Sequence, residues 1–294
     1  MILVTGATGH FGKAAIDFLL KKVNSSELAA LVRDTKKAAD LSAEGVEVRQ
    51  GDYFNYNSLV KAFEGVEKIL FVSSSDLTNR VTQHANVINA AKAANVKHIV
   101  YTSVLNPPEK PYFSAGTDHI ETERLLKDSG VAHTILRNAF YFETLPMFLG
   151  DALETGRIFF PAGDGRLSNA SRIDMAEAAA NVLSGGGHEN KIYEIGANDS
   201  FSFADVAVAL SELAGKQIEY VDIPLEAFKA ELASNQTPAP VIEMLSGIAE
   251  AVKHNELNFP SADLENLLGR KPLALREFLR QTYFGQNAGE SAAA

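Results

Sequence analysis

Three glycines at intervals of three residues, Gly6, Gly9 and Gly12, lie near the start of the chain in "MILVTGATGHFGKAA". A short apolar run precedes them and an amphipathic stretch follows, so they occupy a turn from a strand into a helix. Glycine costs backbone entropy, and a cluster at such a turn is explained if the backbone must approach a ligand closely. The unpartnered N–H groups and the dipole at a helix N-terminus attract phosphate. The pattern therefore predicts a dinucleotide site; a glycine-rich turn without a ligand is the alternative.

Each glycine of this turn has its own predicted role. Gly6 makes the tight turn, Gly9 lets the backbone reach the pyrophosphate, and Gly12 lets the helix pack against the strand. The spacing is G-x-x-G-x-x-G, which differs from the G-x-G-x-x-G of typical dinucleotide-binding dehydrogenases. The predicted pyrophosphate site consists of Gly6, Thr8, Gly9, His10, Phe11 and Gly12.

Apolar runs of strand length alternate with amphipathic stretches through the first half of the chain. The predicted strands cover residues 1–5, 28–33, 46–50, 68–74, 97–103 and 132–137, and the predicted helices cover 10–23, 35–44, 56–64, 78–94 and 115–129. Several of these strands are apolar throughout, as strands covered on both faces are. The alternation predicts βαβ units, and hence an α/β protein with a doubly wound parallel sheet of the Rossmann type.

The rhythm changes after residue 140. A strand that ends in a turn is predicted at 156–166, further strands at 190–196 and 216–223, and further helices at 171–184, 203–214, 226–234 and 239–253. We therefore expect three parts. They are a dinucleotide-binding Rossmann domain over 1–140, a smaller C-terminal α/β substrate lobe over 141–285, interleaved with the last strands of the sheet, and a disordered tail over 286–294.

The composition limits the partners and the compartment. The formal net charge of −10 argues against nucleic acid or an anionic membrane as the main partner. The chain has no cysteine, which excludes disulfide scaffolds, cysteine–zinc sites and thiol nucleophiles and fits a reducing cytoplasm. It shows no signal-peptide pattern and no apolar stretch of the roughly 18–20 residues that a membrane span requires. We expect a cytoplasmic protein with a small-molecule substrate and no metal; a homodimer is the assembly to test.

The end of the second predicted strand distinguishes between the two nicotinamide cofactors. NAD enzymes carry an Asp or Glu there, which holds the ribose hydroxyls of the adenosine. Here "ALVRDTKKAAD" places Arg33 at that position and Lys37 a few residues later. A guanidinium can hold a 2′-phosphate with two charge-assisted hydrogen bonds, which favours NADP(H). Asp34 is the counter-argument, because it can face the ribose; alternatively, Asp34 caps the following helix.

The ends of the next two strands are expected to complete the cofactor cleft, because ligands of open α/β sheets bind beyond the carboxyl ends of the strands. Asp52 and Tyr53 are placed for the adenine, and Ser73, Ser74 and Ser75 for the nicotinamide ribose. The alternative for each of them is ordinary turn chemistry.

No tyrosine of the chain has a lysine four residues after it. Dehydrogenases that reduce unactivated ketones use such a Tyr-x-x-x-Lys pair, in which the tyrosine protonates the forming alkoxide. An alcohol dehydrogenase of that type is therefore not expected. Reduction of a quinone or a cationic dye needs no strong acid at the moment of transfer, so positioning can supply much of the catalysis. The other option is a protein that binds NADPH without turnover.

Candidates for the reacting end of the cofactor lie in the two segments "FSAGTDHIETERLL" and "LRNAFYFE". His119 can donate a hydrogen bond to the nicotinamide ribose or to the substrate, with a cap or surface histidine as the alternative. Asn138 can hydrogen-bond the nicotinamide end or the substrate, and Tyr141 is the other candidate acid.

The aromatic residues of the second segment are candidates for the substrate pocket. Phe140 and Phe142 are expected to form a planar apolar wall with Tyr141; as core aromatics they need no function. Arg172, at the start of the next helix, is a weaker candidate, and an ion pair with Asp174 is its alternative.

Taken together, several segments resemble, in order and spacing, the NmrA-like branch of the atypical short-chain dehydrogenase/reductases: "TGATGHFG", "LVRDTKKA", "QGDY", "FVSSS", "HANVINAAKAANVKHIVYTS", "HIETERLL" and "ILRNAFY". The resemblance covers about residues 1–285 and is greatest to NAD(P)H:quinone oxidoreductases of the second type, then to triphenylmethane dye reductases. It implies a Rossmann domain, NADP(H) and a small substrate lobe. It also implies that His119 replaces the usual lysine and that the cofactor contacts 6–12, Arg33, 73–75 and the Arg137–Asn138–Tyr141 segment.

Three hypotheses about function follow. The favoured one is an NADPH-dependent reductase that passes a hydride to a quinone or a similar small, planar, conjugated acceptor. The second is an NADP(H)-binding redox sensor that regulates a protein partner without turnover. The third is a reductase of triphenylmethane dyes or activated carbonyls, with His119 or Tyr141 as the acid.

Overall fold

A parallel sheet of seven strands, in the order β3-β2-β1-β4-β5-β6-β9, forms the centre of the molecule. The computed structural model describes residues 1–76, 78–105, 108–113 and 115–285. The order steps outward from β1 in both directions, which is the doubly wound topology, so the predicted Rossmann-type α/β fold is confirmed. The strands are β1 (Ile2–Val4), β2 (Leu28–Val32), β3 (Glu47–Gln50), β4 (Lys68–Phe71), β5 (His98–Val104), β6 (Ala132–Asn138) and β9 (Lys191–Ile195).

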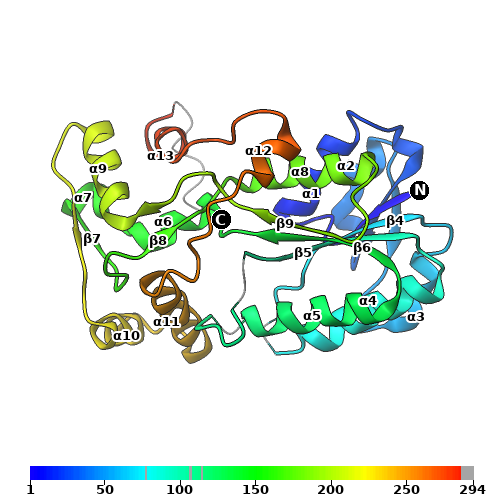
Figure 1. Ribbon diagram of the computed structural model, residues 1–294, viewed down its shortest axis with the longest axis horizontal. Helices are drawn as coiled ribbons and strands as arrows, with labels where there is room; N and C mark the ends of the chain where they lie inside the picture. Colours follow the sequence, from blue (N-terminus) through cyan, green and yellow to red (C-terminus); the bar gives the residue numbers. More distant parts are fainter. Residues whose placement is uncertain (77, 106–107, 114, 286–294) are drawn as a thin grey trace.

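Helices cover both faces of this sheet (Figure 1). One face carries α1 (His10–Leu19), α2 (Ala39–Ala43), α8 (Arg172–Ser184) and α12 (Asp263–Leu268), and the other carries α3 (Tyr56–Ala62), α4 (Arg80–Ala93) and α5 (Ala115–Ser129). Because both faces are covered, β1, β2 and β5 are buried along their whole length. Within the described residues, no helix is both long and apolar enough to cross a membrane.

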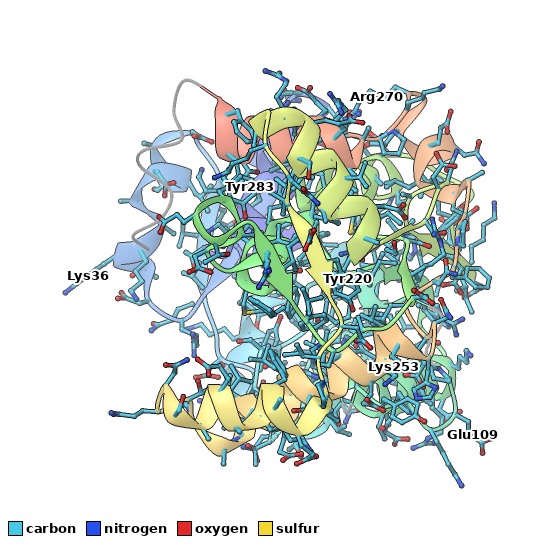
Figure 2. The ribbon with its side chains drawn as sticks, turned by 90° about the vertical axis from the view of Figure 1, so that its left-hand side faces the viewer. Lys36, Glu109, Tyr220, Lys253, Arg270 and Tyr283 are labelled. Carbon is cyan, nitrogen blue, oxygen red and sulfur yellow. The ribbon has the colours of Figure 1, made fainter. Side chains whose placement is uncertain are left out.

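Most of the chain after β6 forms a smaller lobe, at the left of Figure 1 and facing the viewer in Figure 2, where Tyr220 and Tyr283 are labelled. Its strands pair two by two: β7 (Arg157–Phe159) with β11 (Glu219–Val221), and β8 (Arg166–Leu167) with β10 (Phe201–Ser202). Between these elements the chain returns to the sheet to add α8, β9 and α12. The helices of the lobe are α6 (Leu145–Leu149), α7 (Ala152–Thr155), α9 (Phe203–Ala214), α10 (Leu225–Ser234), α11 (Ala239–Lys253) and α13 (Leu275–Phe284).

At 156–166 a strand that ends in a turn was expected, and β7 is followed by a turn there; the second short strand, β8, at the end of this stretch was not expected. The chain turns between them because it approaches the end of α11 closely. A Cβ on Gly165 would lie 2.0 Å from the carbonyl oxygen of Val252, and Gly163 has a φ of +53°. The predicted tail, 286–294, lies outside the described residues.

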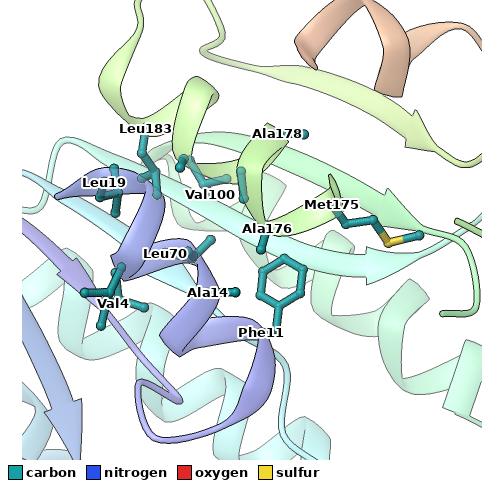
Figure 3. Close-up of a cluster of buried hydrophobic side chains, with 14 of the residues drawn as sticks. Val4, Phe11, Ala14, Leu19, Leu70, Val100, Met175, Ala176, Ala178 and Leu183 are labelled. Atoms are coloured by element: carbon teal, nitrogen blue, oxygen red, sulfur yellow. The ribbon is translucent and has the colours of Figure 1, made fainter. Parts of the chain in front are cut away.

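The contact between α1 and α8 fixes the start of α1 beside the sheet. Figure 3 shows the ring of Phe11 beside Met175 and Ala176 of α8. Phe11 is only 6% exposed, and both α8 residues are fully buried. The first turn of α1 is therefore held rigidly at the carboxyl end of β1, which places the glycine turn.

Candidate cofactor and acceptor site

The carboxyl ends of the strands meet at one edge of the sheet, and predicted cofactor residues lie directly there. Gly6, Arg33, Asp52 and Ser73 come within two residues of the ends of β1, β2, β3 and β4, and Asn138 is the last residue of β6. The structure thus gathers predicted residues from five segments of the chain along one edge, where open α/β sheets bind their ligands.

The glycine turn is closed by its own backbone. Gly6 has a φ of +59°, and its carbonyl oxygen accepts the N–H of Gly9 at 2.9 Å. Gly9 is the N-cap residue of α1 and has no side chain to cap it, and within the described residues the N–H groups of His10 and Phe11 donate no hydrogen bond. A Cβ on Gly12 would lie 2.3 Å from the Gly6 carbonyl oxygen. The turn therefore presents free N–H donors at a helix N-terminus, which suits a pyrophosphate.

The two charged residues beyond β2 have different surroundings. The Asp34 carboxylate caps the short 3-10 turn that follows it, because its Oδ1 accepts the N–H of Lys36 at 3.0 Å. Arg33 is exposed and has no ion-pair partner within the described residues. Lys37 is exposed as well, and Lys36 extends away from the body of the molecule (Figure 2). Within the described residues, a guanidinium rather than a carboxylate is thus without an ion-pair partner at the place predicted for the adenosine ribose.

An open groove of about 780 Å³ continues from Arg33 along β3, and Asp52 lines it. Tyr53, the other residue predicted for the adenine, is tied to the ends of β1 and β4. Its hydroxyl donates to the carbonyl oxygen of Val72 at 2.8 Å and lies 2.5 Å from Thr5 Oγ1. Burial raises the pKa of Tyr53 well above its usual value. Contact of Tyr53 with the adenine stays a prediction.

The serines after β4 form a rim whose backbone is anchored from two sides. The N–H of Ser73 donates to Thr102 Oγ1 on β5 at 2.9 Å, and the N–H of Ser74 donates to His84 Nε2 on α4 at 2.9 Å. Ser75 is exposed. These hydrogen bonds hold the rim at a defined distance from β5 and α4. A surface that binds a ribose needs such a fixed position.

Hydrogen bonds around His84 determine its tautomer. Its Nε2 accepts the N–H of Ser74 and therefore carries no hydrogen. Its Nδ1 lies 2.8 Å from Thr122 Oγ1, and the Thr122 hydroxyl donates to the Asp118 carbonyl oxygen at 2.7 Å. The hydrogen is assigned to Nδ1, which donates to Thr122. Burial, aided by the electrostatic influence of His119 and Arg80, lowers the pKa of His84 to about 2, so the ring is neutral.

His119 presents an N–H donor next to this network. The side chain lies in α5, is 8% exposed, and places Nδ1 2.7 Å from the Tyr101 hydroxyl on β5. Burial, and then the charge of Arg80, lowers the pKa of His119 to about 3, so the ring is neutral. We assign the Tyr101 hydroxyl as the donor to Nδ1, which places the ring hydrogen on Nε2. Within the described residues, no hydrogen-bond partner of Nε2 is found.

The Asn138 amide is buried at the end of β6 with its polar atoms unpartnered in the described part of the chain. Its side chain is 5% exposed, and neither Oδ1 nor Nδ2 has a hydrogen-bond partner within the described residues. Buried polar atoms are rarely left without a partner, because each one costs free energy. The Tyr141 hydroxyl is close enough to the Asn138 amide for their interaction to lower the pKa of Tyr141, but the two groups do not meet the distance and angle of a hydrogen bond. One free acceptor beside one free donor matches the carboxamide of a nicotinamide.

Tyr141 lies between the glycine turn and α8. Its ring stacks on Phe11, with ring centroids 6.2 Å apart, and the guanidinium of Arg172 lies 4.8 Å from its centroid on α8. Burial raises the pKa of Tyr141, and the positive charge of Arg172 opposes this rise. The phenol therefore stays protonated at neutral pH and is a weak acid.

The Arg137 side chain is engaged away from the predicted cofactor. Its guanidinium pairs with Glu123 on α5 at 2.8 Å and with Glu194 on β9 at 2.9 Å. Both carboxylates hold the pKa of Arg137 above its usual value. Arg137 thus ties β6 to α5 and β9. A contact between its side chain and the cofactor stays a prediction.

The two phenylalanines predicted for the substrate pocket are separated by the fold. Phe140 is half-buried, packs edge-on against Phe113 and lines a small enclosed apolar space in the lobe. Phe142 is 2% exposed and lies inside the core of the lobe, where it stacks on Phe278 with centroids 5.3 Å apart. Because Phe142 is sealed in that core, it does not form an open wall together with Phe140.

Sequence reasoning missed the partners of His119. Tyr101 belongs to β5 and Arg80 to α4, and neither was singled out. His84 offered a signal: it stands four residues before Ile88, on the apolar side of the predicted helix, and a histidine in such a place is buried. Its tautomer and its partners depend on α5, which no local pattern reveals.

The two buried histidines make the folded state sensitive to acid. Their pKa values are lowered to about 2 and about 3 on folding, so the unfolded chain binds more protons below the ordinary value of 6.5. We therefore expect the free energy of unfolding to fall from pH 7 to pH 5 by about 2 kcal/mol for each of His84 and His119. Urea titrations across this range should give a shallower slope for His119→Gln than for the unchanged protein. Equal slopes for His119→Gln and the unchanged protein would contradict the assignment.

Comparisons with known proteins match nearly the whole chain. A model of the NmrA-like family matches residues 1–282. Quinone oxidoreductase 2 of Escherichia coli (strain K12) is 41% identical over 277 residues, which are 94% of this chain and 96% of that protein. The crystal structure of an E. coli NADPH-dependent quinone oxidoreductase with NADPH has a TM-score of 0.91 and 41% identity, and covers 94% of this chain and 98% of its own. The triphenylmethane reductase of Citrobacter sp. with NADP(H) has a TM-score of 0.90 and 38% identity, with coverage of 96% and 99%.

Proposed function

This chain belongs to the NmrA-like family, and on that premise we propose that it is an NADPH-dependent oxidoreductase that reduces quinones and similar conjugated acceptors. The observation that carries the proposal is the buried Asn138 amide without partners, at the sheet edge that also holds the glycine turn. The relatives support it, because proteins named as NADPH-dependent quinone oxidoreductase and triphenylmethane reductase match nearly all of the chain.

The residues of the edge fit NADPH from end to end. Arg33 and Lys37 would hold the 2′-phosphate, the N–H groups of the glycine turn would hold the pyrophosphate, and Asn138 would hold the nicotinamide carboxamide. When bound, the cofactor supplies a hydride to the acceptor. The missing cysteines fit a reducing compartment, and the cytoplasm is the proposed location.

The role of His119 in the reaction is to donate a hydrogen bond from Nε2 to the acceptor oxygen, which gains negative charge as it is reduced. A neutral ring with a pKa near 3 cannot act as a strong acid at neutral pH, but it can stabilise a hydroquinone anion as a fixed dipole. Tyr101 keeps the hydrogen on Nε2, and Tyr141 contributes an apolar surface and a weakly acidic hydroxyl.

A pair of variants tests this role. His119→Gln keeps an N–H donor near the place of Nε2, whereas His119→Phe keeps only the ring shape. We expect kcat for a naphthoquinone to fall about 100-fold in His119→Phe and clearly less in His119→Gln, with the NADPH dissociation constant little changed. Steady-state kinetics and NADPH fluorescence titration measure the two quantities. Equal losses in both variants would show that the donor is not what matters.

A panel of acceptors tests the function itself. The loss of NADPH absorbance is followed with a benzoquinone, a naphthoquinone, a triphenylmethane dye and an aromatic aldehyde. We expect rapid loss with the quinones and little with the aldehyde, because no strong acid is placed to protonate an alkoxide. The similarity to the Citrobacter enzyme makes the dye the second candidate acceptor. Tight NADPH binding without turnover on any acceptor would favour a redox sensor instead.

A further inference from the structure

Arg172 is unusual among the arginines of the described residues. Eight others form ion pairs: Arg49, Arg80, Arg124, Arg137, Arg166, Arg270, Arg276 and Arg280. Only Arg33, Arg157 and Arg172 have no carboxylate within ion-pair distance there, and of these Arg172 alone is partly buried. In a chain with a formal net charge of −10, a partly buried guanidinium without a counter-ion indicates an anionic ligand.

The acidic residues around Arg172 are used elsewhere. Both carboxylate oxygens of Glu143 accept the backbone N–H of Arg172, at 3.0 and 3.1 Å, and form no ion pair with its guanidinium. Asp174 pairs with Arg270 at 2.7 Å and accepts the N–H of Leu273 at 2.7 Å. The ion pair between Arg172 and Asp174 that the sequence left open is therefore absent. Arg270 (Figure 2) forms the ion pair with Asp174 instead.

The position of the guanidinium is defined on both sides. Ser171 caps α8 through its Oγ, and Ala170 forms a bridge with Tyr141, so the start of the helix is fixed beside the segment that follows β6. The guanidinium rests on the Tyr141 ring, whose stacking partner is Phe11 of the glycine turn. Arg172 thus lies between the turn that would hold the pyrophosphate and the lobe that would hold the acceptor.

We propose that Arg172 binds an anionic group of the acceptor, a carboxylate or sulfonate, and makes acidic aromatic acceptors better ligands than neutral ones of the same shape. The planar fork of a guanidinium matches such groups with two hydrogen bonds, and the cation–π contact with the Tyr141 ring helps to hold it in place. The proposal depends on the proposed function in one respect: the bound anion is taken to be the substrate that is reduced. A second anion within reach is the cofactor pyrophosphate, and the test separates the two.

The test measures binding without turnover. The complex with NADP⁺ is titrated with 2-naphthoate and with 2-naphthamide, which share a ring system and differ in charge. We expect naphthoate to bind about 10-fold more tightly than naphthamide, and Arg172→Gln to remove this difference while NADP⁺ affinity stays within about 2-fold. Arg172→Lys should retain part of the difference, because it keeps the charge without the fork. Arg124→Gln makes the same charge change on the far face of the sheet and should change nothing.

Three results would overturn the proposal. The first is equal affinity for naphthoate and naphthamide in the unchanged protein. The second is a loss of NADP⁺ affinity in Arg172→Gln with the naphthoate preference intact, which would assign the guanidinium to the pyrophosphate. The third is an equal loss for both naphthalenes, which would leave Arg172 as a support for Tyr141. A different result would refute the proposed function but not this proposal. In that case no quinone would cause NADPH consumption, yet naphthoate would still bind more tightly than naphthamide in a way that depends on Arg172.

Discussion

Replacement of Gly12 by alanine is expected to raise the NADPH dissociation constant at least about 100-fold, because two or more charge-assisted hydrogen bonds to phosphate would be lost. The new Cβ would lie 2.3 Å from the carbonyl oxygen and 2.8 Å from the carbonyl carbon of Gly6, so the backbone of the turn has to move. That movement displaces the N–H groups of His10 and Phe11. Fluorescence titration with NADPH measures the effect.

Two further variants separate binding from folding. A Cβ on Gly9 would lie 3.3 Å from the Gly6 oxygen, a contact that a small shift relieves, so Gly9→Ala should fold normally. Its NADPH binding should nevertheless be weakened, because the methyl group stands where the phosphate approaches. Gly186→Ala meets no atom within 4 Å and should match the unchanged protein in both stability and binding. If Gly12→Ala and Gly9→Ala bound NADPH as tightly as Gly186→Ala does, the turn would not be the pyrophosphate site.

Replacement of Arg33 by alanine is expected to weaken NADPH binding about 10- to 100-fold and to leave NADH binding nearly unchanged. The guanidinium is exposed without an ion-pair partner in the described part of the chain, and Asp34 is occupied as a cap, so only the cofactor with a 2′-phosphate gains from Arg33. Dissociation constants for both cofactors give the ratio directly. Arg157→Ala removes another exposed, unpaired arginine from β7 and is the matched control. Equal losses for NADPH and NADH in Arg33→Ala would contradict the 2′-phosphate assignment.

The sheet and its long helices could be predicted because their signals are local. The predicted helix 115–129 coincides with α5, and the strand runs around β1 to β6 agree with the structure within a few residues. The unpredicted α6 and α7 have only five and four residues, too few for a helical period to be recognised. They form because they pack in the core of the lobe, where Leu145, Leu149 and Ala152 are buried.

In the candidate site, the positions set by the backbone could be predicted from the sequence. The contacts of the side chains were harder to predict. Glycine spacing and strand ends fixed the edge, because those positions follow from topology. The neighbours of Tyr53 and Arg137 are as far as 48 and 57 residues away in the sequence, so nothing local shows that their side chains are engaged in the interior. His119 was predicted as a donor, but its neutral state depends on burial and on Arg80, which only the fold brings near.

The most direct test of the account is an anaerobic measurement of products with a naphthoquinone and NADPH. We predict that each NADPH consumed yields one hydroquinone, and that NADPH deuterated at the transferred position slows the reaction. NADH in place of NADPH should react far more slowly, because Arg33 then has no phosphate to hold. If NADPH bound but no hydroquinone formed with any quinone tested, the protein would not be a quinone reductase.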